Sequence, residues 1–245
     1  MDNGLFWLGR DRRGQGMVYR ANGYAGQRIS THAVEWQIQQ YDNISDAIAY
    51  TYQQDGHSFY VLIFPTANTT WVYDVATQAW HERAGFTNGE FTRHRSNCQM
   101  SFNNQIVVGD FQNGNIYAFD LEDYSDNGQI QKWLRSWRAL PTGQNNLKRT
   151  AQHSLQLDCE SGTGLNLGQG SDPQVMLRWS DDGGHTWSNE HWVSIGKIGE
   201  YYRRAIWRRL GMTLKLRDRV YEVSGTDPVK IAIMGAELIL SPTNA

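Results

Sequence analysis

Apolar and polar residues alternate with a period of two along most of this 245-residue chain, and turn residues interrupt the alternation at short intervals. Residues 47–84 show the pattern most clearly, because they divide into four short strands joined by turns at Asp55-Gly56, Ala67-Asn68 and Ala76-Thr77. Successive side chains of a strand point to opposite faces, so a period of two predicts strands. The short connections predict antiparallel hairpins.

The same plan recurs on both sides of this segment. Residues 96–120 divide into three strands, with turns at Asn103-Asn104 and Asn113-Gly114, and the strands LFWLGR and MVYRA form a further copy near the start. The aromatic positions Tyr19, Tyr73 and Tyr117 lie 54 and 44 residues apart, which is the blade spacing of a β-propeller. A closed ring needs ~4–8 blades. We therefore expect either an open arc of blades or a share of a propeller that a longer chain completes.

One segment, THAVEWQIQQYD, has helical periodicity instead. Val34, Ile38 and Tyr41 fall on one face of a helix, and Thr31 is a suitable N-cap. The pattern predicts one helix, near residues 32–42, inserted between the first two repeats.

The pattern changes after about residue 140. Six or seven short strands follow, and a glycine-rich loop, Ser161–Pro173, lies among them without the helix that a phosphate-binding loop requires. Antiparallel strands in this number, over roughly 95 residues, are typical of a β-sandwich. We therefore predict an all-β chain, with partial β-propeller-like blades over residues 1–140 and an antiparallel β-sandwich over residues 150–245. The boundary is expected between 138 and 152.

Composition supports this fold class and narrows the function. The chain has 24 Gly, 10 Trp and 12 Tyr, which suits many strands and tight turns, and its formal charge of −2 gives no overall attraction to nucleic acid. No segment is apolar enough to predict a signal peptide or a membrane span, which disfavours an exported adhesion module. Cys98 and Cys159 are expected to be reduced thiols, the alternative being a single disulfide.

Motifs for enzyme chemistry are missing from the sequence. The seven histidines show no metal-binding spacing, and there is no Cys-x-x-Cys pair, Walker loop or G-x-S-x-G motif. His185 and His191 could face each other across a hairpin, which we interpret as coincidence rather than as a zinc site. We predict a protein that is not an enzyme and has no catalytic residue, no metal and no cofactor.

The stretch SDDGGHTW, Ser180 to Trp187, fits S-x-D-x-G-x-T-W, a hairpin signature called an Asp-box that is best known from sialidases. Asp182 can accept hydrogen bonds from amides that its turn leaves unpaired, and Trp187 can fold over the hairpin. We interpret the motif as structural, and its residues are Ser180, Asp182, Gly184, Thr186 and Trp187. A sialidase would also need an arginine triad, a tyrosine nucleophile and an acid, and no spacing indicates such a set. The alternative function is a sialidase-type propeller that binds or hydrolyses glycans.

Positive charge is concentrated between Lys197 and Arg219, where the sequence has eight basic residues and only two acidic ones, Glu200 and Asp218. Either the arginines pair with acids such as Glu222 on neighbouring strands, or they form a docking edge for an acidic protein surface or for the DNA backbone. A period of two places Ala205, Trp207 and Arg209 on one face, and Ile206, Arg208 and Leu210 on the other.

Arginine and aromatic residues are enriched in protein interfaces, so we expect an interaction surface here. The candidate residues are Tyr201, Tyr202, Arg203, Arg204, Trp207, Arg208 and Arg209. At least two of the four arginines are expected to contact another protein subunit, with DNA as the less favoured partner. The segment WLRSWR, residues 133–138, is the second candidate.

Two regions of the chain resemble a known family. The segments LRWSDDGGHTWS, IGKIGEY, RRAIWRRLG and TDPVKIAIMGAEL, and the earlier FWLGRDRRGQGMVYRANGYAGQRISTHAVE, resemble the packaged DNA stabilisation proteins of short-tailed bacteriophages, a head-completion and tail hub family. Members of that family are commonly longer, with the additional part before the position of residue 1.

The resemblance implies a structural virion protein of the tail or head–tail junction, made in the host cytoplasm. It implies a ring of identical copies that helps to close the portal channel and retain packaged DNA. The implied partners are portal or adaptor proteins and tail needle or fibre proteins, with no membrane and no small-molecule substrate.

Overall fold

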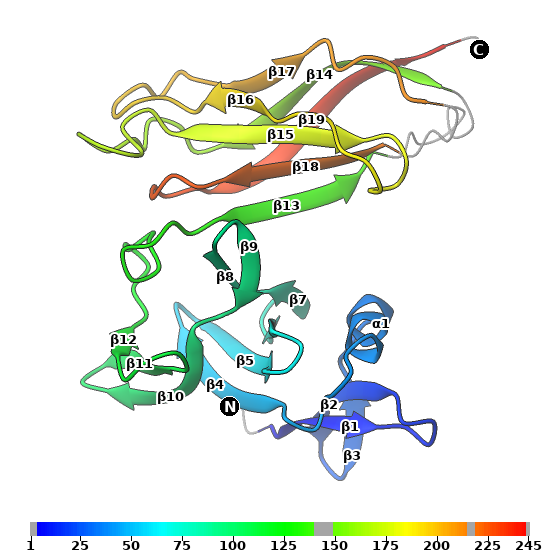
Figure 1. Ribbon diagram of the computed structural model, residues 1–245, viewed down its shortest axis with the longest axis vertical. Helices are drawn as coiled ribbons and strands as arrows, with labels where there is room; N and C mark the ends of the chain where they lie inside the picture. The colour runs from blue at the N-terminus through cyan, green and yellow to red at the C-terminus, as the bar shows by residue number, and fades with distance from the viewer. Residues whose placement is uncertain (1–3, 140–148, 215–218, 244–245) are drawn as a thin grey trace. The chain divides into compact units, whose positions relative to one another are not determined.

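The computed structural model describes residues 4–139, 149–214 and 219–243 (Figure 1). Among these residues, strands hold 51% and helix 4%, which confirms the predicted all-β class. The chain divides into two compact units, Met1–Asp120 and Leu121–Ala245. Within the described ranges, no helix is both long enough and apolar enough to cross a membrane.

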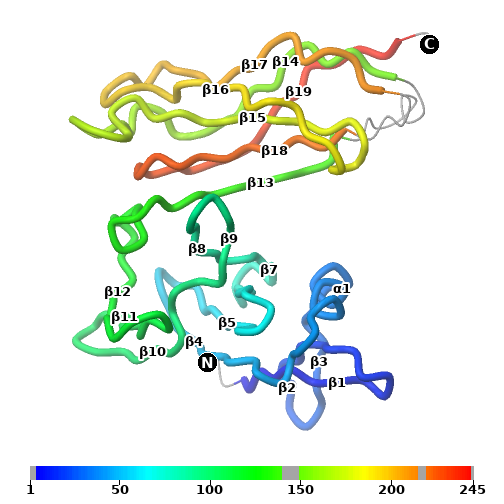
Figure 2. Tube along the Cα trace, in the orientation of Figure 1, coloured from blue at the N-terminus to red at the C-terminus, as the bar shows by residue number. Residues whose placement is uncertain are grey.

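The described part of the first unit contains three antiparallel sheets of three or four strands, which follow one another along the chain (Figure 2). The first sheet has the order β1 (Phe6–Arg10), β2 (Gly16–Asn22), β3 (Ala25–Arg28). The second has the order β4 (Ile48–Gln54), β5 (His57–Phe64), β6 (Thr69–Asp74), β7 (Ala79–Glu82). The third has the order β10 (Ser96–Phe102), β11 (Gln105–Asp110), β12 (Ile116–Ala118). A hairpin that the pattern did not predict, β8 (Ala84–Thr87) and β9 (Glu90–Arg93), lies between the second and third sheets in the chain.

Two of the predicted turns have the backbone that two-residue hairpins require. Asp55 and Gly56 have φ of 50° and 77°, and Asn103 and Asn104 have φ of 48° and 59°. Two successive residues with positive φ form the turn type whose twist matches that of the flanking strands. Gly, Asn and Asp adopt this region at lower cost than other residues, which is why these positions could be read from the sequence.

The helix α1 (His32–Gln39) lies where the periodicity predicted it, although it ends three residues earlier. The Thr31 hydroxyl caps its first turn by accepting a hydrogen bond from the amide of Val34, at 3.4 Å. Val34 and Ile38 are buried. The buried carboxylate of Glu35 accepts hydrogen bonds from the guanidinium of Arg28 and the hydroxyl of Ser30, so the helix is tied to the end of the first sheet.

The three sheets pack face to face through two apolar clusters. Tyr60, Leu62 and Phe64 of β5 pack against Phe6 and Leu8 of the first sheet. The intervening residues of β5 point the other way, and their cluster includes Ile106 and Phe119 of the third sheet. The near-continuous apolar run of β5 is therefore explained by burial on both of its faces.

The second unit is a β-sandwich. One sheet has the order β13 (Trp133–Arg138), β18 (Val220–Gly225), β15 (Gln174–Ser180), β16 (His191–Ser194). The other has the order β17 (Ala205–Arg208), β14 (Thr150–Cys159), β19 (Ile233–Pro242). Leu155, Leu157 and Trp207 of the three-stranded sheet meet Leu177 and Val223 of the four-stranded sheet in the core. All six strands expected after residue 150 are present.

The predicted boundary between residues 138 and 152 is corrected. Strand β13 pairs with β18 along its whole length, from Trp133 opposite Gly225 to Arg138 opposite Val220. It therefore belongs to the sandwich, and the division between the units follows Asp120. The alternation in WLRSWR indicates a strand, but alternation alone does not say which sheet accepts it.

Candidate interaction surface

The turn after β15 is held by its own polar side chains. The carboxylate of Asp182 accepts hydrogen bonds from the Ser180 hydroxyl at 2.6 Å and from the amide and hydroxyl of Thr186 at 2.9 and 2.7 Å. The Ser180 hydroxyl in turn accepts from the amide of Gly184 at 2.8 Å. The hydrogen bonds from Ser180 and then Thr186 hold the pKa of Asp182 well below its usual range. The donors of these hydrogen bonds to the carboxylate are residues of the turn itself.

Trp187 lies over this turn, where a methyl group added to Gly184 would come 3.8 Å from its ring. The guanidinium of Arg178 lies 4.6 Å from the centre of the Trp187 ring and donates a hydrogen bond to Glu222 at 2.5 Å. The five motif residues thus make contacts that stabilise the hairpin, and this geometry supports the structural interpretation. Glu222, expected as a partner for the arginines near β17, is bound to Arg178 instead.

Arg219, one of the eight basic residues between Lys197 and Arg219, is an interior side chain with 1% of its surface exposed. Its guanidinium donates two hydrogen bonds to the carboxylate of Asp181, at 2.6 and 2.7 Å. It also donates to the backbone carbonyls of Leu210 and Met212, at 2.7 and 3.2 Å. Arg219 therefore anchors the segment after β17 to the turn after β15 and takes no part in an interaction surface.

The loop between β16 and β17 has a backbone fixed by neighbouring segments. The amide of Gly199 donates to the carbonyl of Gly162, and the Ser161 hydroxyl donates to the carbonyl of Tyr201, at 3.2 and 3.0 Å. The carboxylate of Glu200 accepts from Arg203 at 3.2 Å. A side chain at Gly162 would come 2.7 Å from the Tyr201 ring, so glycine is required for this close packing. The loop presents its side chains from a defined backbone.

Four consecutive side chains of this loop, Tyr201, Tyr202, Arg203 and Arg204, are exposed and are called the loop surface below. Tyr201 and Tyr202 have 75% and 77% of their surface exposed. Beside them lies a pocket of about 460 Å³, which is also lined by Gln156, Asp158 and Ser161. The loop surface thus combines two aromatic rings and two guanidinium groups at the rim of a polar hollow.

The remaining candidates, on β17 and directly after it, differ in burial: Trp207 is buried, whereas Arg208 and Arg209 are exposed. Trp207 is a core residue, 4% exposed, and its indole donates to the carbonyl of His191 at 2.8 Å, so it cannot be part of an exposed surface. Arg209 has a φ of 60°, a left-handed conformation that ends the strand and breaks the alternation. Arg209 is consequently exposed and Leu210 buried, which is the reverse of the predicted faces.

Arg208 lies on the outer face of the three-stranded sheet, directly opposite Ser154 of β14. Arg204 comes just before β17 and Arg208 ends it, so their backbones are roughly 13 Å apart at ~3.3 Å per strand residue. In the part of the chain that the structure describes, Arg204, Arg208 and Arg209 form no ion pair with an acid. The second candidate, β13, packs Trp133 and Trp137 against the core and leaves Arg135 exposed.

Two family models match the chain, and their order along it agrees with the two units. Residues 1–124 match the model described as "Bacteriophage P22 Gp10, beta-propeller", and residues 132–240 match "Bacteriophage P22 Gp10, beta-sandwich". The chain belongs to the bacteriophage P22 Gp10 family. This confirms the resemblance found in the sequence and the propeller and sandwich classes. As a member of the P22 Gp10 family, the chain is a structural protein of the phage virion.

Other comparisons add little. One solved structure, described as a glycoside hydrolase, covers 95% of this chain and 69% of its own, with 8% sequence identity and a TM-score of 0.23. A likeness this low carries no argument about fold or activity. No curated protein matches the chain.

Proposed function

We propose that this chain works at the head–tail junction, where it helps to close the portal channel and retain packaged DNA, and that it has no enzymatic activity. Its sandwich is proposed to dock onto neighbouring virion proteins through the loop surface and Arg208. The observation that carries the proposal is the group of exposed Tyr and Arg side chains on a fixed loop of a phage structural protein.

The chemistry of the loop surface fits a protein partner. Tyrosine and arginine are the residue types that contribute most to protein interfaces, because each buries a large area and forms directed hydrogen bonds. A guanidinium can bind a carboxylate with two parallel hydrogen bonds. A loop that is already ordered loses less entropy on binding. Proposed partners are other copies in a ring, portal or adaptor proteins, and tail needle or fibre proteins.

DNA is the less favoured partner for this surface. The charge of the whole chain is −2, and the acids Asp158 and Glu200 lie among the arginines. A site that follows a DNA backbone needs a continuous basic footprint. A protein surface with acidic residues can instead bind a small patch in which basic and acidic side chains are mixed.

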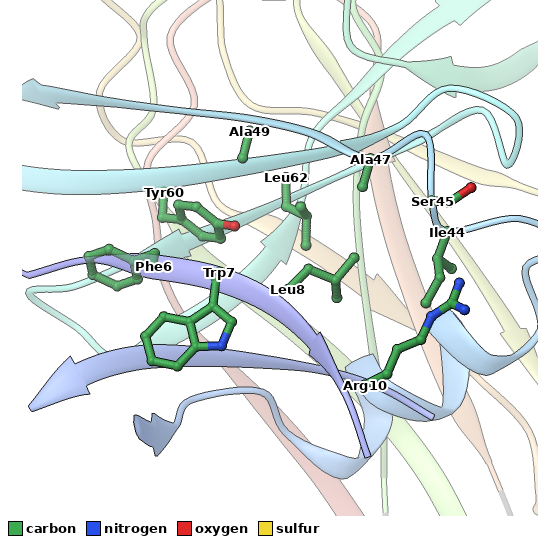
Figure 3. A pocket seen from close by; sticks show the side chains of 10 residues that line it. All are labelled: Phe6, Trp7, Leu8, Arg10, Ile44, Ser45, Ala47, Ala49, Tyr60 and Leu62. Carbon is green, nitrogen blue, oxygen red and sulfur yellow. The ribbon is translucent and has the colours of Figure 1, made fainter. Parts of the chain in front are cut away.

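Glycan hydrolysis is not favoured by the pocket chemistry. A pocket of about 500 Å³ between the first and second sheets is lined by apolar side chains such as Leu8 and Tyr60, with Arg10 at one end (Figure 3). Its lining contains no carboxylate, and most glycosidases need two. The pocket beside the loop surface contains one, Asp158. A fluorogenic sialoside assay and a glycan array should therefore show neither turnover nor tight binding, and either result would support the sialidase-type alternative.

The role in retaining DNA is tested with phage that lack the gene. Heads should fill with DNA and then lose it, which nuclease treatment of the particles and quantification of protected DNA would reveal. In particles from the complete phage, a gold-labelled copy of the chain should appear at the head–tail junction. Normal amounts of protected DNA without the gene would contradict the proposed role, and a label elsewhere on the particle would contradict the proposed position.

A further inference from the structure

The glycine-rich loop, residues 161–173, extends from the same end of the sandwich as the loop between β16 and β17 (Figure 1). Its backbone is closed on itself, because the amide of Leu165 donates a hydrogen bond to the carbonyl of Gly170 at 2.7 Å. Gly170 has a φ of 90°, a conformation that glycine adopts at little cost. The residues between these two form a turn, and Leu167 lies in the middle of it.

Glycines allow the two loops to pack against each other. A side chain at Gly164 would come 3.0 Å from the backbone nitrogen of Ile198, and one at Gly162 would collide with the ring of Tyr201. The amide of Gly162 also donates a hydrogen bond to the carbonyl of Ile195 at 3.2 Å. The two loops are therefore held together, and the side chains of Ile198 and Tyr201 lie beside the glycine-rich loop.

Apolar side chains of both loops are exposed to solvent. Leu167 is 86% exposed, Ile198 is 58% exposed and Leu165 is 40% exposed. Apolar side chains stabilise a fold through burial, so these three contribute little to the stability of the sandwich. Neighbouring exposed apolar side chains instead mark surfaces that bind other molecules. These three side chains, together with Tyr201 and Tyr202, are called the tip surface below.

Two cations flank the tip surface. Lys197 precedes Ile198 and Arg204 follows the tyrosines, and both side chains are exposed. Neither forms an ion pair with an acid among the residues that the structure describes, whereas Arg203 pairs with Glu200. A complementary partner therefore needs carboxylates for these two cations, next to apolar side chains.

We propose that the tip surface binds an amphipathic segment of another virion protein, whose apolar side chains cover those of the tip surface and whose carboxylates pair with Lys197 and Arg204. The inference rests on the proposed docking of the sandwich, and it adds the glycine-rich loop and the chemistry of the partner. A second copy of the chain fits less well, because identical tips that face each other would bring like charges together. DNA and an anionic lipid surface also fit less well, because Glu200 and Asp158 lie among the cations.

Photo-cross-linking in assembled particles tests the proposal. Phage lacking the gene are complemented with the chain carrying p-benzoylphenylalanine in place of Leu167 or of Tyr201, and irradiated particles are digested and analysed by mass spectrometry. Both positions should cross-link to one segment of the same second protein, and that segment should contain Asp or Glu among apolar residues. The matched control carries the cross-linker in place of Trp192, an aromatic residue of β16 that is 57% exposed and lies outside the tip surface. It should not reach that segment.

The outcomes separate this inference from the proposed docking. The absence of any cross-link from Leu167 would overturn the inference, and if Tyr201 still cross-links to a virion protein, the docking itself stands. Cross-links from Leu167 to a second copy of this chain, to DNA or to lipid would also overturn the inference. A cross-linked segment without carboxylates would do the same.

A double substitution in the tip surface gives an independent test. Leu167→Ser with Ile198→Ser changes two exposed side chains, so the variant should keep the melting temperature of the parent. The loss of two apolar contacts should lower its incorporation into particles by about tenfold or more. Trp192→Ser is the matched control and should be incorporated normally. Incorporation of the double variant at the level of the parent, or an equal loss for Trp192→Ser, would overturn the inference.

Discussion

Arginine residues close together in the sequence have different roles in the sandwich. Arg178 and Arg219 are held by Glu222 and Asp181 inside or at the edge of the unit. Arg204 and Arg208 are exposed and form no ion pair within the described ranges. Charge alone does not separate these roles, because burial depends on which strands become neighbours. A concentration of arginines therefore predicts a surface only for those side chains that the sheets do not cover.

Loss of the Asp181 carboxylate should strongly destabilise the sandwich. Asp181→Ala leaves the charge of Arg219 buried without its partner, which costs about 3–5 kcal/mol in comparable buried pairs. Urea unfolding, followed by tryptophan fluorescence, measures the loss. Lys230→Ala is the matched control, since it breaks the exposed pair with Glu160, and surface pairs contribute about 0–1 kcal/mol. Equal effects of the two substitutions would contradict the assigned role of Arg219.

The turn after β15 should contribute to acid sensitivity. Hydrogen bonds from Ser180 and Thr186 lower the pKa of Asp182 below its ordinary value of 3.8. The folded state therefore releases this proton more readily than the unfolded state, and the resulting stability is complete above pH ~4 and is lost as the pH falls further. The Asp182→Asn variant should have a lower melting temperature than the parent at neutral pH. Its melting temperature should then fall less than that of the parent when the pH is lowered. Parallel melting curves of variant and parent would contradict this role.

Elements whose signals are local were predicted well, and elements that depend on distant partners were not. The cap at Thr31 and the spacing of Val34 and Ile38 indicate α1 without any tertiary information. The first hairpin of the second sheet follows from Asp55 and Gly56, residue types that adopt positive φ at low cost. The β8–β9 hairpin was missed because its strands have only four residues each and little apolar alternation. The sheet to which β13 belongs depends on β18, which lies more than 80 residues later in the chain.

The strand β10 is preceded by a histidine that should remain neutral over a wide pH range. Burial, and then the positive charges of Arg83 and Arg95, lower the pKa of His94 to about 3. Its Nδ1 accepts a hydrogen bond from the amide of Ser96 at 3.2 Å, which requires an unprotonated nitrogen. The folded state is therefore more stable with His94 neutral than with His94 protonated.

Stability should fall in acid because of this histidine. Between pH 6.5 and about 3 the unfolded state binds a proton at His94 that the folded state excludes, so the free energy of unfolding falls as pH falls. The slope from one such group is at most about 1.4 kcal/mol per pH unit. Urea titrations at a series of pH values should show a shallower slope for His94→Gln. The exposed His32 provides the control, and its substitution by Gln should leave the slope of the parent.

At the scale of the whole molecule, two units of different architecture serve one virion protein. The periods and turns predicted both architectures, and the resemblance predicted the family. The exposure of the candidate residues was predicted only in part: Tyr201, Tyr202, Arg203 and Arg204 are exposed, whereas Trp207 belongs to the core. Strand alternation assigned Arg209 and Leu210 to the wrong faces, because the left-handed conformation at Arg209 is a property of the folded backbone.

The central claim is that the sandwich docks in the virion through exposed arginines near β17. The most direct measurement is the amount of the chain in purified particles when phage lacking the gene are complemented with variants. The double charge reversal Arg204→Glu with Arg208→Glu should fold with the parent melting temperature and yet be absent from particles. The matched reversal Arg12→Glu with Arg13→Glu changes two exposed arginines of the first unit and should be incorporated normally. Incorporation of the Arg204 and Arg208 variant at the level of the parent would contradict the account.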